Sequence, residues 1–188
     1  MGYGITREEA LELVHKHLKN PNMVNHCLAS EAVLGALATR LGEDEQKWRL
    51  AGLLHDLDAE SHEDLDVHTQ ETARILEEKG VDPEIIEAIR LHNPQAHPGE
   101  RRSTPLHHAL AAGETITGLI VAAALVNPAR KLAAVKAKSV KKRFKEKAFA
   151  RGANREIIGE CELLGLTVPD FCELGLTAMQ EIAGDIGL

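Results

Sequence analysis

Several histidines and acids of this sequence lie inside apolar helical patterns, and a metal ion would account for them. Residues 53–60 join an apolar run to the adjacent pair His55-Asp56 and then to two further acids, Asp58 and Glu60. An ionisable group at a buried helix end is costly unless it is paired or bound to a metal. Because neighbouring residues on a helix diverge by about 100°, His55 and Asp56 can share one centre most easily where the helix ends. The stretch therefore predicts a metal centre whose other ligands come from elsewhere in the chain.

Two further residues qualify by the same reasoning, His26 and Glu114, since each lies within an apolar helical pattern of its own. Neutral imidazole nitrogens and carboxylate oxygens suit Mn, Fe, Co, Ni or Zn, and suit Mg less well. A single histidine of this kind is more often a hydrogen-bonded core or surface residue. The prediction of a divalent transition metal therefore depends on the group as a whole.

Helices are expected to position these residues. Thr6-Arg7-Glu8-Glu9 is a capping box that opens a helix to about residue 18. Further helices are predicted over about 23–41, 44–54, 67–79, 82–92 and 103–126, with loops over 57–66 and 93–102. Beyond them, Asn127-Pro128 is expected to open a helix, Ser139 to cap another, and two more to cover 154–164 and 170–188. Since no strand alternation is visible, the predicted fold is all-α, a single-domain helical bundle over residues 1–188.

The composition is consistent with such a bundle. Hydrophobic residues make up 44% of the 188 residues and aromatic residues only 3%, which is typical of helices packed through aliphatic side chains. The three cysteines, Cys27, Cys161 and Cys172, have no CxxC spacing and are expected to be reduced thiols. The longest apolar run, 116–126, is too short to span a bilayer, and no signal pattern opens the chain. The expected location is cytoplasmic, without a membrane partner.

The arrangement of a helical histidine, a His-Asp pair and a later acid resembles the HD superfamily of metal-dependent hydrolases. The matching stretches are Asn-His-Cys-Leu-Ala at 25–29, Ala-Gly-Leu-Leu-His-Asp-Leu-Asp at 51–58, and the alanine-rich stretch with Glu114 at 109–120. The resemblance implies a metal-binding core over 20–125 and a helical extension over 126–188. One departure is that the family's final aspartate is replaced by Glu114, whose carboxylate lies about one C–C bond further from the backbone.

Two further histidines, His68 and His92, extend this resemblance to HD proteins that bind two metals. It implies that Asp56 bridges two ions, with His68 and His92 on the second. Without the resemblance, His68 would be interpreted as a solvated residue of a first helical turn, and His92 as a cation favoured by a helix C-terminus.

The remaining histidines and acids receive less specific predictions. His107 lies seven residues before Glu114, on the same helix face, and is predicted to contact substrate or to support the ligands. Asp58 and Glu60 are candidate general acid or base groups because they follow Asp56 closely; the alternative is that both are loop acids facing water. Structural or surface roles are expected for His15, His17, His62, His97 and His108.

Positive charge is concentrated in the basic segment, defined as residues 130–155, which carries half of the 22 lysines and arginines and is opposed only by Glu146. We expect Lys138, Lys141 and Lys142 to bind substrate phosphates, the alternatives being a solvated helix face or a nucleic-acid patch. The net charge of −7 and the few aromatic residues argue against nucleic acid as a partner.

The function expected from these residues and this resemblance is hydrolysis of a phosphomonoester or phosphodiester, with a nucleotide among the candidate substrates, by water activated on one or two metal ions. Two other functions stay open. Some HD proteins use a mixed-valent di-iron site for oxidative cleavage, and a third hypothesis is a non-catalytic module that binds metal or nucleotide. The residues do not indicate an oligomeric state.

Overall fold

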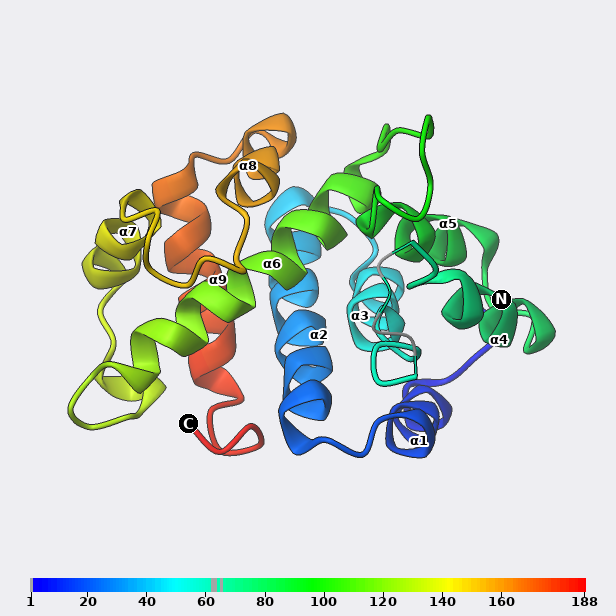
Figure 1. Ribbon diagram of the computed structural model, residues 1–188, viewed down its shortest axis with the longest axis horizontal. Helices are drawn as coiled ribbons and strands as arrows, with labels where there is room; N and C mark the ends of the chain where they lie inside the picture. The colour runs from blue at the N-terminus through cyan, green and yellow to red at the C-terminus, as the bar shows by residue number, and fades with distance from the viewer. Residues whose placement is uncertain (1, 62–63, 65) are drawn as a thin grey trace.

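The computed structural model describes residues 2–61, 64 and 66–188, and over these residues the regular structure is helical, without strands. Figure 1 shows two long helices, α2 and α6, crossing in the middle, with the smaller N-terminal helices on one side and the C-terminal helices on the other. The elements are α1 (Arg7–His17), α2 (Pro21–Leu41), α3 (Glu45–Leu54), α4 (Gln70–Glu78), α5 (Pro83–His92), α6 (Pro105–Leu125), η1 (Leu132–Ala134), α7 (Ala137–Lys145), α8 (Arg155–Ile158), η2 (Gly159–Leu164) and α9 (Val168–Glu181). The all-α prediction is confirmed.

Local sequence determines where most helices begin. The capping box at Thr6 is formed, since its hydroxyl accepts from the Glu9 amide at 3.2 Å and its own amide donates to the Glu9 carboxylate at 2.8 Å. The three helices that carry His26, His92 and Glu114 each begin with a side-chain cap followed by proline: Asn20 caps α2, Asp82 caps α5 and Thr104 caps α6.

Three predicted helix starts were wrong. Asn127-Pro128 opens a turn, in which the Arg130 amide donates to the Asn127 carbonyl at 2.9 Å and Arg130 has a φ of 48°, so a helix cannot continue there. Ser139 is the third residue of α7 and Lys136 is its N-cap. The helix expected from residue 67 begins at Gln70, after Thr69 adopts a left-handed conformation with a φ of 85°. The loop expected over 57–66 includes residues 62, 63 and 65, which lie outside the described residues.

Helix α2, which carries His26, and helix α3, whose C-cap is His55, approach each other closely. α2 packs against α3, α6 and α9. At the α2–α3 contact, a Cβ built on Gly52 would lie 2.7 Å from the Ser30 carbonyl oxygen, so a residue with a side chain would push the helices apart. Glycine at this position therefore lets the C-terminus of α3, with His55, approach His26 of α2.

The C-terminal extension packs on the same core as the rest of the chain. α9 contacts α2 and α6, and α7 contacts α9 and α6. Buried residues of the extension, such as Leu132, Ile158 and Phe171, belong to one hydrophobic cluster with α2 and α6. An ion pair joins the two parts directly, because Arg102, in the loop before α6, contacts both oxygens of Glu160 in η2.

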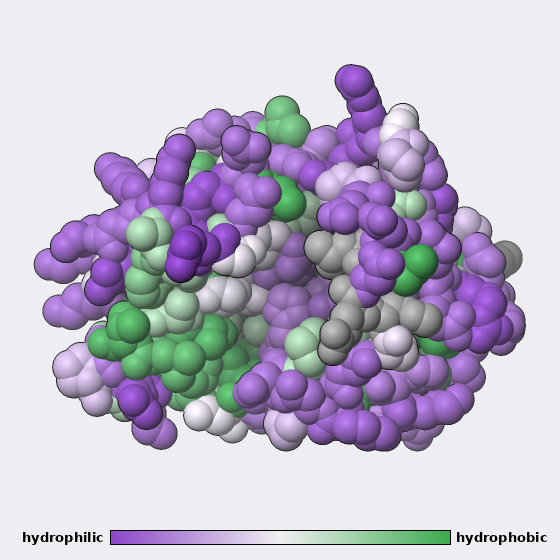
Figure 2. Space-filling view, viewed as in Figure 1, coloured by the Kyte–Doolittle hydropathy of each residue, from purple (hydrophilic) through white to green (hydrophobic). Residues whose placement is uncertain are grey.

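Helix α6 is long and apolar enough to cross a membrane by length and composition, but 67% of its most apolar window is buried inside the protein. Its apolar character is explained by its contacts with α2, α5 and α9. The surface in front of α6 is hollowed near the middle of the face shown in Figure 2, with hydrophilic atoms in the hollow and a hydrophobic patch beside it over the C-terminal half of α6.

Candidate metal centre

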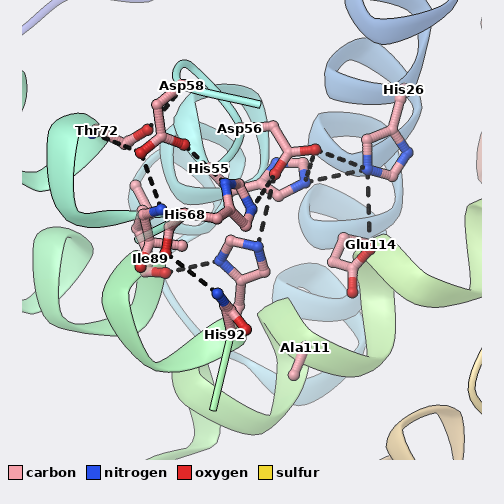
Figure 3. A network of polar contacts seen from close by, with 12 residues as sticks. His26, His55, Asp56, Asp58, His68, Thr72, Ile89, His92, Ala111 and Glu114 are labelled. Atoms are coloured by element: carbon pink, nitrogen blue, oxygen red, sulfur yellow. Dashed lines mark hydrogen bonds and ion pairs between the residues drawn. The ribbon is translucent and has the colours of Figure 1, made fainter. Parts of the chain in front are cut away.

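Four histidines converge on the carboxylate of Asp56, just after α3 ends (Figure 3). His26 Nε2 and His55 Nε2 lie 3.5 and 3.4 Å from Asp56 Oδ2. His68 Nε2 and His92 Nε2 lie 3.2 and 3.6 Å from the other oxygen, Oδ1. The candidate ligands therefore form two groups of three, each with two imidazoles and the shared carboxylate of Asp56.

Each imidazole is held by its outer nitrogen. His55 Nδ1 lies 2.9 Å from the Gly52 carbonyl oxygen and His92 Nδ1 lies 2.6 Å from that of Ile89. Because a carbonyl oxygen only accepts, both Nδ1 atoms carry a proton, and in the neutral rings the Nε2 lone pairs point inward.

The same reasoning fixes the ring of His26. The Thr117 hydroxyl donates its single proton to the Glu114 carbonyl at 2.6 Å, so it accepts from His26 Nδ1 at 3.0 Å. His26 Nε2 is then left with a lone pair facing His55 Nε2, 3.1 Å away. When both rings are neutral, these two lone pairs repel each other, and a proton or a metal ion between them removes the repulsion.

The spacing of the ligand atoms fits a first-row transition metal. Metal–nitrogen bonds of about 2.0–2.1 Å at tetrahedral or octahedral angles place neighbouring ligand atoms about 3.0–3.4 Å apart. The contacts of Asp56 with the four imidazoles span 3.2–3.6 Å. Nitrogen ligands with carboxylate oxygens favour Mn, Fe, Co, Ni or Zn, and outer hydrogen bonds to each histidine are typical of metal sites.

Burial keeps His55 neutral and Asp56 is ionised. Complete burial lowers the pKa of His55 to about 3. Burial alone would raise the pKa of Asp56, but the nearby His55 and the hydrogen bonds of His68 and His92 outweigh it and hold that pKa well below its usual range. The centre thus offers an anionic oxygen donor at physiological pH.

His68 lies between two carboxylates. Its Nε2 faces Asp56, and its Nδ1 donates to Asp58 Oδ1 at 2.7 Å. Burial lowers the pKa of His68, but the hydrogen bonds and charges of Asp56 and Asp58 prevail and raise it to about 10. In the metal-free protein His68 therefore carries a proton on the side facing Asp56, where a metal ion would replace it.

Glu114 lies at the edge of this arrangement. Its Oε2 is 3.8 Å from His26 Nε2, and Oε1 accepts from the Thr115 hydroxyl. Burial raises the pKa of Glu114, with His26 and His92 acting in the opposite direction. The structure thus brings Glu114 to the His26 side of the centre, further out than Asp56.

Asp58, a candidate general acid or base from the sequence, is turned away from the centre. It is fully buried, and while Oδ1 accepts from His68, Oδ2 accepts from the amides of Thr69 and Thr72 at 2.8 and 3.1 Å. These amides belong to the N-terminus of α4, so Asp58 caps that helix and orients His68. Its geometry fits a positioning residue, since both oxygens are occupied.

Glu60 also lies outside the centre. Its carboxylate accepts from the amides of Lys19 and Asn20, at 2.8–3.0 Å, and so holds the chain just before α2. The side chain is exposed and is not brought to the ligands.

The predicted substrate-binding residues are not brought to the centre either. His107 lines a separate cavity of about 330 Å³ with Tyr3, Lys47 and Glu87, because two helical turns separate it from Glu114. Lys141 pairs with Glu173 of α9 at 2.9 Å, and Lys142 lies 3.9 Å from Glu146. Lys138 lies on the same helix, α7, which packs against α9 and α6.

One cation of the basic segment is structural. The Arg155 guanidinium donates to the carbonyls of Phe144, Phe149 and Ala150, at 3.1, 2.5 and 3.0 Å. It therefore closes the turn that follows α7.

Two of the other histidines have polar side-chain partners among the described residues. His108 contacts Glu160 at 2.7 Å, and His97 is buried between Thr69 and Arg90. His15 is exposed on α1, and His17 is half-buried on the same helix. His62 lies outside the described residues.

Sequence reasoning missed the groups that orient the ligands. The residue pattern does not identify Thr117, Thr69 or Thr72 as part of the site. Of the three, Thr117 would have been the easiest to predict, because it follows Glu114 by three residues on the same helix face. The partners of His55 and His92 are backbone carbonyls, which every residue has, so the residue types could not indicate them.

Comparison with known proteins agrees with this geometry. A family model described as the HD domain matches residues 23–124, and the chain belongs to this family. Ribonuclease Y of Thermosipho melanesiensis is 31% identical over 142 residues, which cover 72% of this chain and 27% of that protein. Ribonuclease Y 2 of Levilactobacillus brevis is 34% identical over 98 residues, covering 52% of this chain and 18% of that protein. The chain thus spans about a quarter or less of the length of these relatives. No solved structure matches it.

Proposed function

We propose that this protein hydrolyses a phosphoester bond at a centre of two divalent transition-metal ions bridged by Asp56. The observation that carries the proposal is the division of the Asp56 carboxylate, with Oδ2 facing His26 and His55 and Oδ1 facing His68 and His92. His26, His55, Asp56 and Glu114 would hold one ion, and Asp56, His68 and His92 the other.

The reaction exchanges one bond to phosphorus for another. A water oxygen forms a bond to phosphorus, the ester P–O bond breaks, and the leaving oxygen takes up a proton. When bound, the ions would lower the pKa of a coordinated water toward neutrality and neutralise charge on the phosphoryl oxygens.

The residues around the centre fix the position and the protonation state of the four imidazoles. The outer hydrogen bonds of the four imidazoles fix their Nε2 atoms toward one region, at no reorganisation cost during the reaction. Complete burial of His55 and Asp58 on the α3 side excludes water from behind the ligands. The phosphate must then approach from the open side, where His26 and Glu114 are part-exposed.

We propose a small phosphorylated substrate. No lysine or arginine contacts the six ligands among the described residues, so the centre itself must bind the phosphate. Because the matched relatives carry the name ribonuclease Y, an RNA oligonucleotide is the alternative substrate that the experiment has to include.

The test is turnover by purified protein loaded with Mn, Fe, Co, Ni or Zn. The panel contains p-nitrophenyl phosphate, bis(p-nitrophenyl) phosphate, nucleoside monophosphates and an RNA oligonucleotide. We expect metal-dependent release of phosphate or phosphomonoester that His55→Ala and Asp56→Ala reduce at least about 100-fold, whereas His15→Ala, an exposed histidine of α1, has no effect. Turnover that survives in Asp56→Ala, or none with any metal, would contradict the proposal; oxygen consumption by the iron form would indicate oxidative chemistry instead.

A further inference from the structure

A second cavity adjoins the metal centre. It has a volume of about 360 Å³ and lies between α2, α6 and the last residues of the chain. Its inner end is formed by His26 and Thr117, the hydrogen-bonded pair that fixes the ring facing the first metal position. Its wall is apolar and includes Ala29, Val121, Leu125, Ile186 and Leu188.

The C-terminal residues are fastened to this cavity. The Asn25 side-chain amide donates to the Ile186 carbonyl at 3.1 Å, which holds the end of the chain against α2. Ile186 is buried, whereas Leu125 on the opposite side is half-exposed. The cavity is therefore formed jointly by the HD core and the C-terminal extension, and the hydrophobic patch of Figure 2 lies over the same part of α6.

Gly118 keeps this cavity open. It is the one exposed residue between Leu106 and Ile120 of α6, and a Cβ built on it meets no atom within 4 Å. Glycine inside a helix is less stable than alanine there. No neighbouring atom requires glycine here, so packing does not explain this residue; its missing side chain leaves free space in the cavity that His26 also lines.

The chemistry of the lining selects the ligand. The cavity is lined by no lysine, arginine or acidic side chain, and its polar side chains are Asn22, Asn25, His26 and Thr117. No lysine or arginine lines the cavity to neutralise a phosphate group, whereas an apolar group would lose its contact with water against the aliphatic wall. The volume lies at the lower end of the range for small-molecule sites, about 300–1,000 Å³.

We infer that this cavity holds the uncharged, largely apolar organic group of the substrate while its phosphate lies at the metal centre. The inference depends on the proposed function for its phosphate end. It specifies an aryl or alkyl phosphoester, with Gly118 as a specificity-determining residue.

The experiment fills the cavity without touching a metal ligand. Gly118→Leu places a side chain into the open space. The matched control is Gly152→Leu, because Gly152 is an exposed glycine after α7 and a Cβ built on it also meets no atom within 4 Å. Both variants are assayed with 1-naphthyl phosphate and with methyl phosphate. We expect Gly118→Leu to lower kcat/KM for 1-naphthyl phosphate at least tenfold relative to methyl phosphate, and Gly152→Leu to leave this ratio unchanged. An unchanged ratio in Gly118→Leu would overturn the inference.

A binding measurement separates the inference from the proposed function. Uncharged 1-naphthol, followed by its fluorescence with the full-length metal-free protein, is expected to bind wild type and Gly152→Leu and to bind Gly118→Leu at least tenfold more weakly. If no substrate is hydrolysed but Gly118→Leu loses naphthol binding, phosphoester hydrolysis is refuted and the apolar site is supported. Equal binding by all three proteins, or none by wild type, would refute the apolar site.

Folding of the variants is checked with Gly118→Ala. Because alanine stabilises a helix interior relative to glycine, the Tm is expected to rise by about 2–4 °C. A fall in Tm would show that the position is not open space, contrary to the inference.

Discussion

His68 Nε2 lies 3.2 Å from Asp56 Oδ1, and the opposite nitrogen of the same ring is bonded to Asp58 at 2.7 Å. One imidazole thus connects the carboxylate at the centre to a second carboxylate that caps α4. The two acids are two residues apart in sequence, but Asp56 faces the candidate metal positions, whereas Asp58 holds the outer nitrogen of His68 and the N-terminus of α4.

Replacing Asp58 tests its role as a positioning residue. In Asp58→Ala, His68 loses its outer acceptor and α4 loses its cap, so the affinity of the second metal position should fall about 10–100-fold while the first is retained. Asp58→Asn keeps one acceptor oxygen and should restore part of the affinity. Metal titration by calorimetry measures both.

Glu60 provides the matched control for that experiment. Its carboxylate contacts only backbone amides ahead of α2 among the contacts described, so Glu60→Gln should change metal affinity by less than about twofold and lower stability by about 1 kcal/mol. A loss of metal affinity in Glu60→Gln equal to that in Asp58→Ala would contradict the division of tasks.

Thr117 should control the first metal position through His26. Thr117→Val keeps the shape of the side chain but removes the acceptor of His26 Nδ1, so the ring is no longer fixed in its tautomer. We expect about tenfold weaker binding of the first ion, recovered in Thr117→Ser. Chelator competition measures the affinity, and wild-type affinity in Thr117→Val would show that His26 is oriented by something else.

Glu114 should suit this chain better than the shorter aspartate. With Oε2 already 3.8 Å from His26 Nε2, Glu114→Asp withdraws the carboxylate by about one C–C bond. The expected result is weaker retention of the first ion and lower kcat, with Glu114→Gln separating the effect of charge from that of length. An Asp variant more active than wild type would indicate that α6 shifts to accommodate it.

The ion pair between the HD core and the extension predicts a pH dependence of stability. Burial opposes ionisation of Glu160, but the hydrogen bonds of Arg102 and His108 prevail and lower its pKa. A carboxyl whose pKa is lower in the folded state stabilises the protein above its unfolded pKa, and this contribution is lost as the pH falls from about 4.5 through the folded value.

Glu160→Gln should therefore cost about 1–2 kcal/mol of unfolding free energy at pH 7, and the difference from wild type should shrink below about pH 4.5. Denaturant unfolding at several pH values measures it, with the exposed Glu162→Gln as control. A difference that is constant from pH 7 to pH 3 would rule out this linkage.

Much of the fold could be predicted from the sequence because it is specified locally. The caps at Thr6, Asn20, Asp82 and Thr104 each satisfy a helix N-terminus within a few residues, and apolar spacing identifies the buried faces. The extension was predicted less well. Its two wrong helix starts are at Asn127-Pro128 and Ser139, whereas α8, which Asn154 caps, and η2 lie within the helix predicted over 154–164.

The residues that converge on Asp56 could be picked out from the sequence for a different reason from the groups around them. His26, His55 and Asp56 are polar residues in apolar patterns, which is a feature of the sequence itself. Asp58, Glu60 and His107 are equally polar, but their roles depend on which backbone amides or cavity they face. His107 shows the limit, since sharing a helix face with Glu114 still leaves about 10 Å between them along the axis.

The most direct test of the central claim is the number of metal ions that each chain binds. Asp56 should bridge two positions, so wild type is expected to retain two ions after removal of free metal, His92→Ala one, and Asp56→Ala none with comparable affinity. Elemental analysis of dialysed protein gives this number. Two ions retained by Asp56→Ala, or none by wild type, would contradict a metal centre organised around this carboxylate.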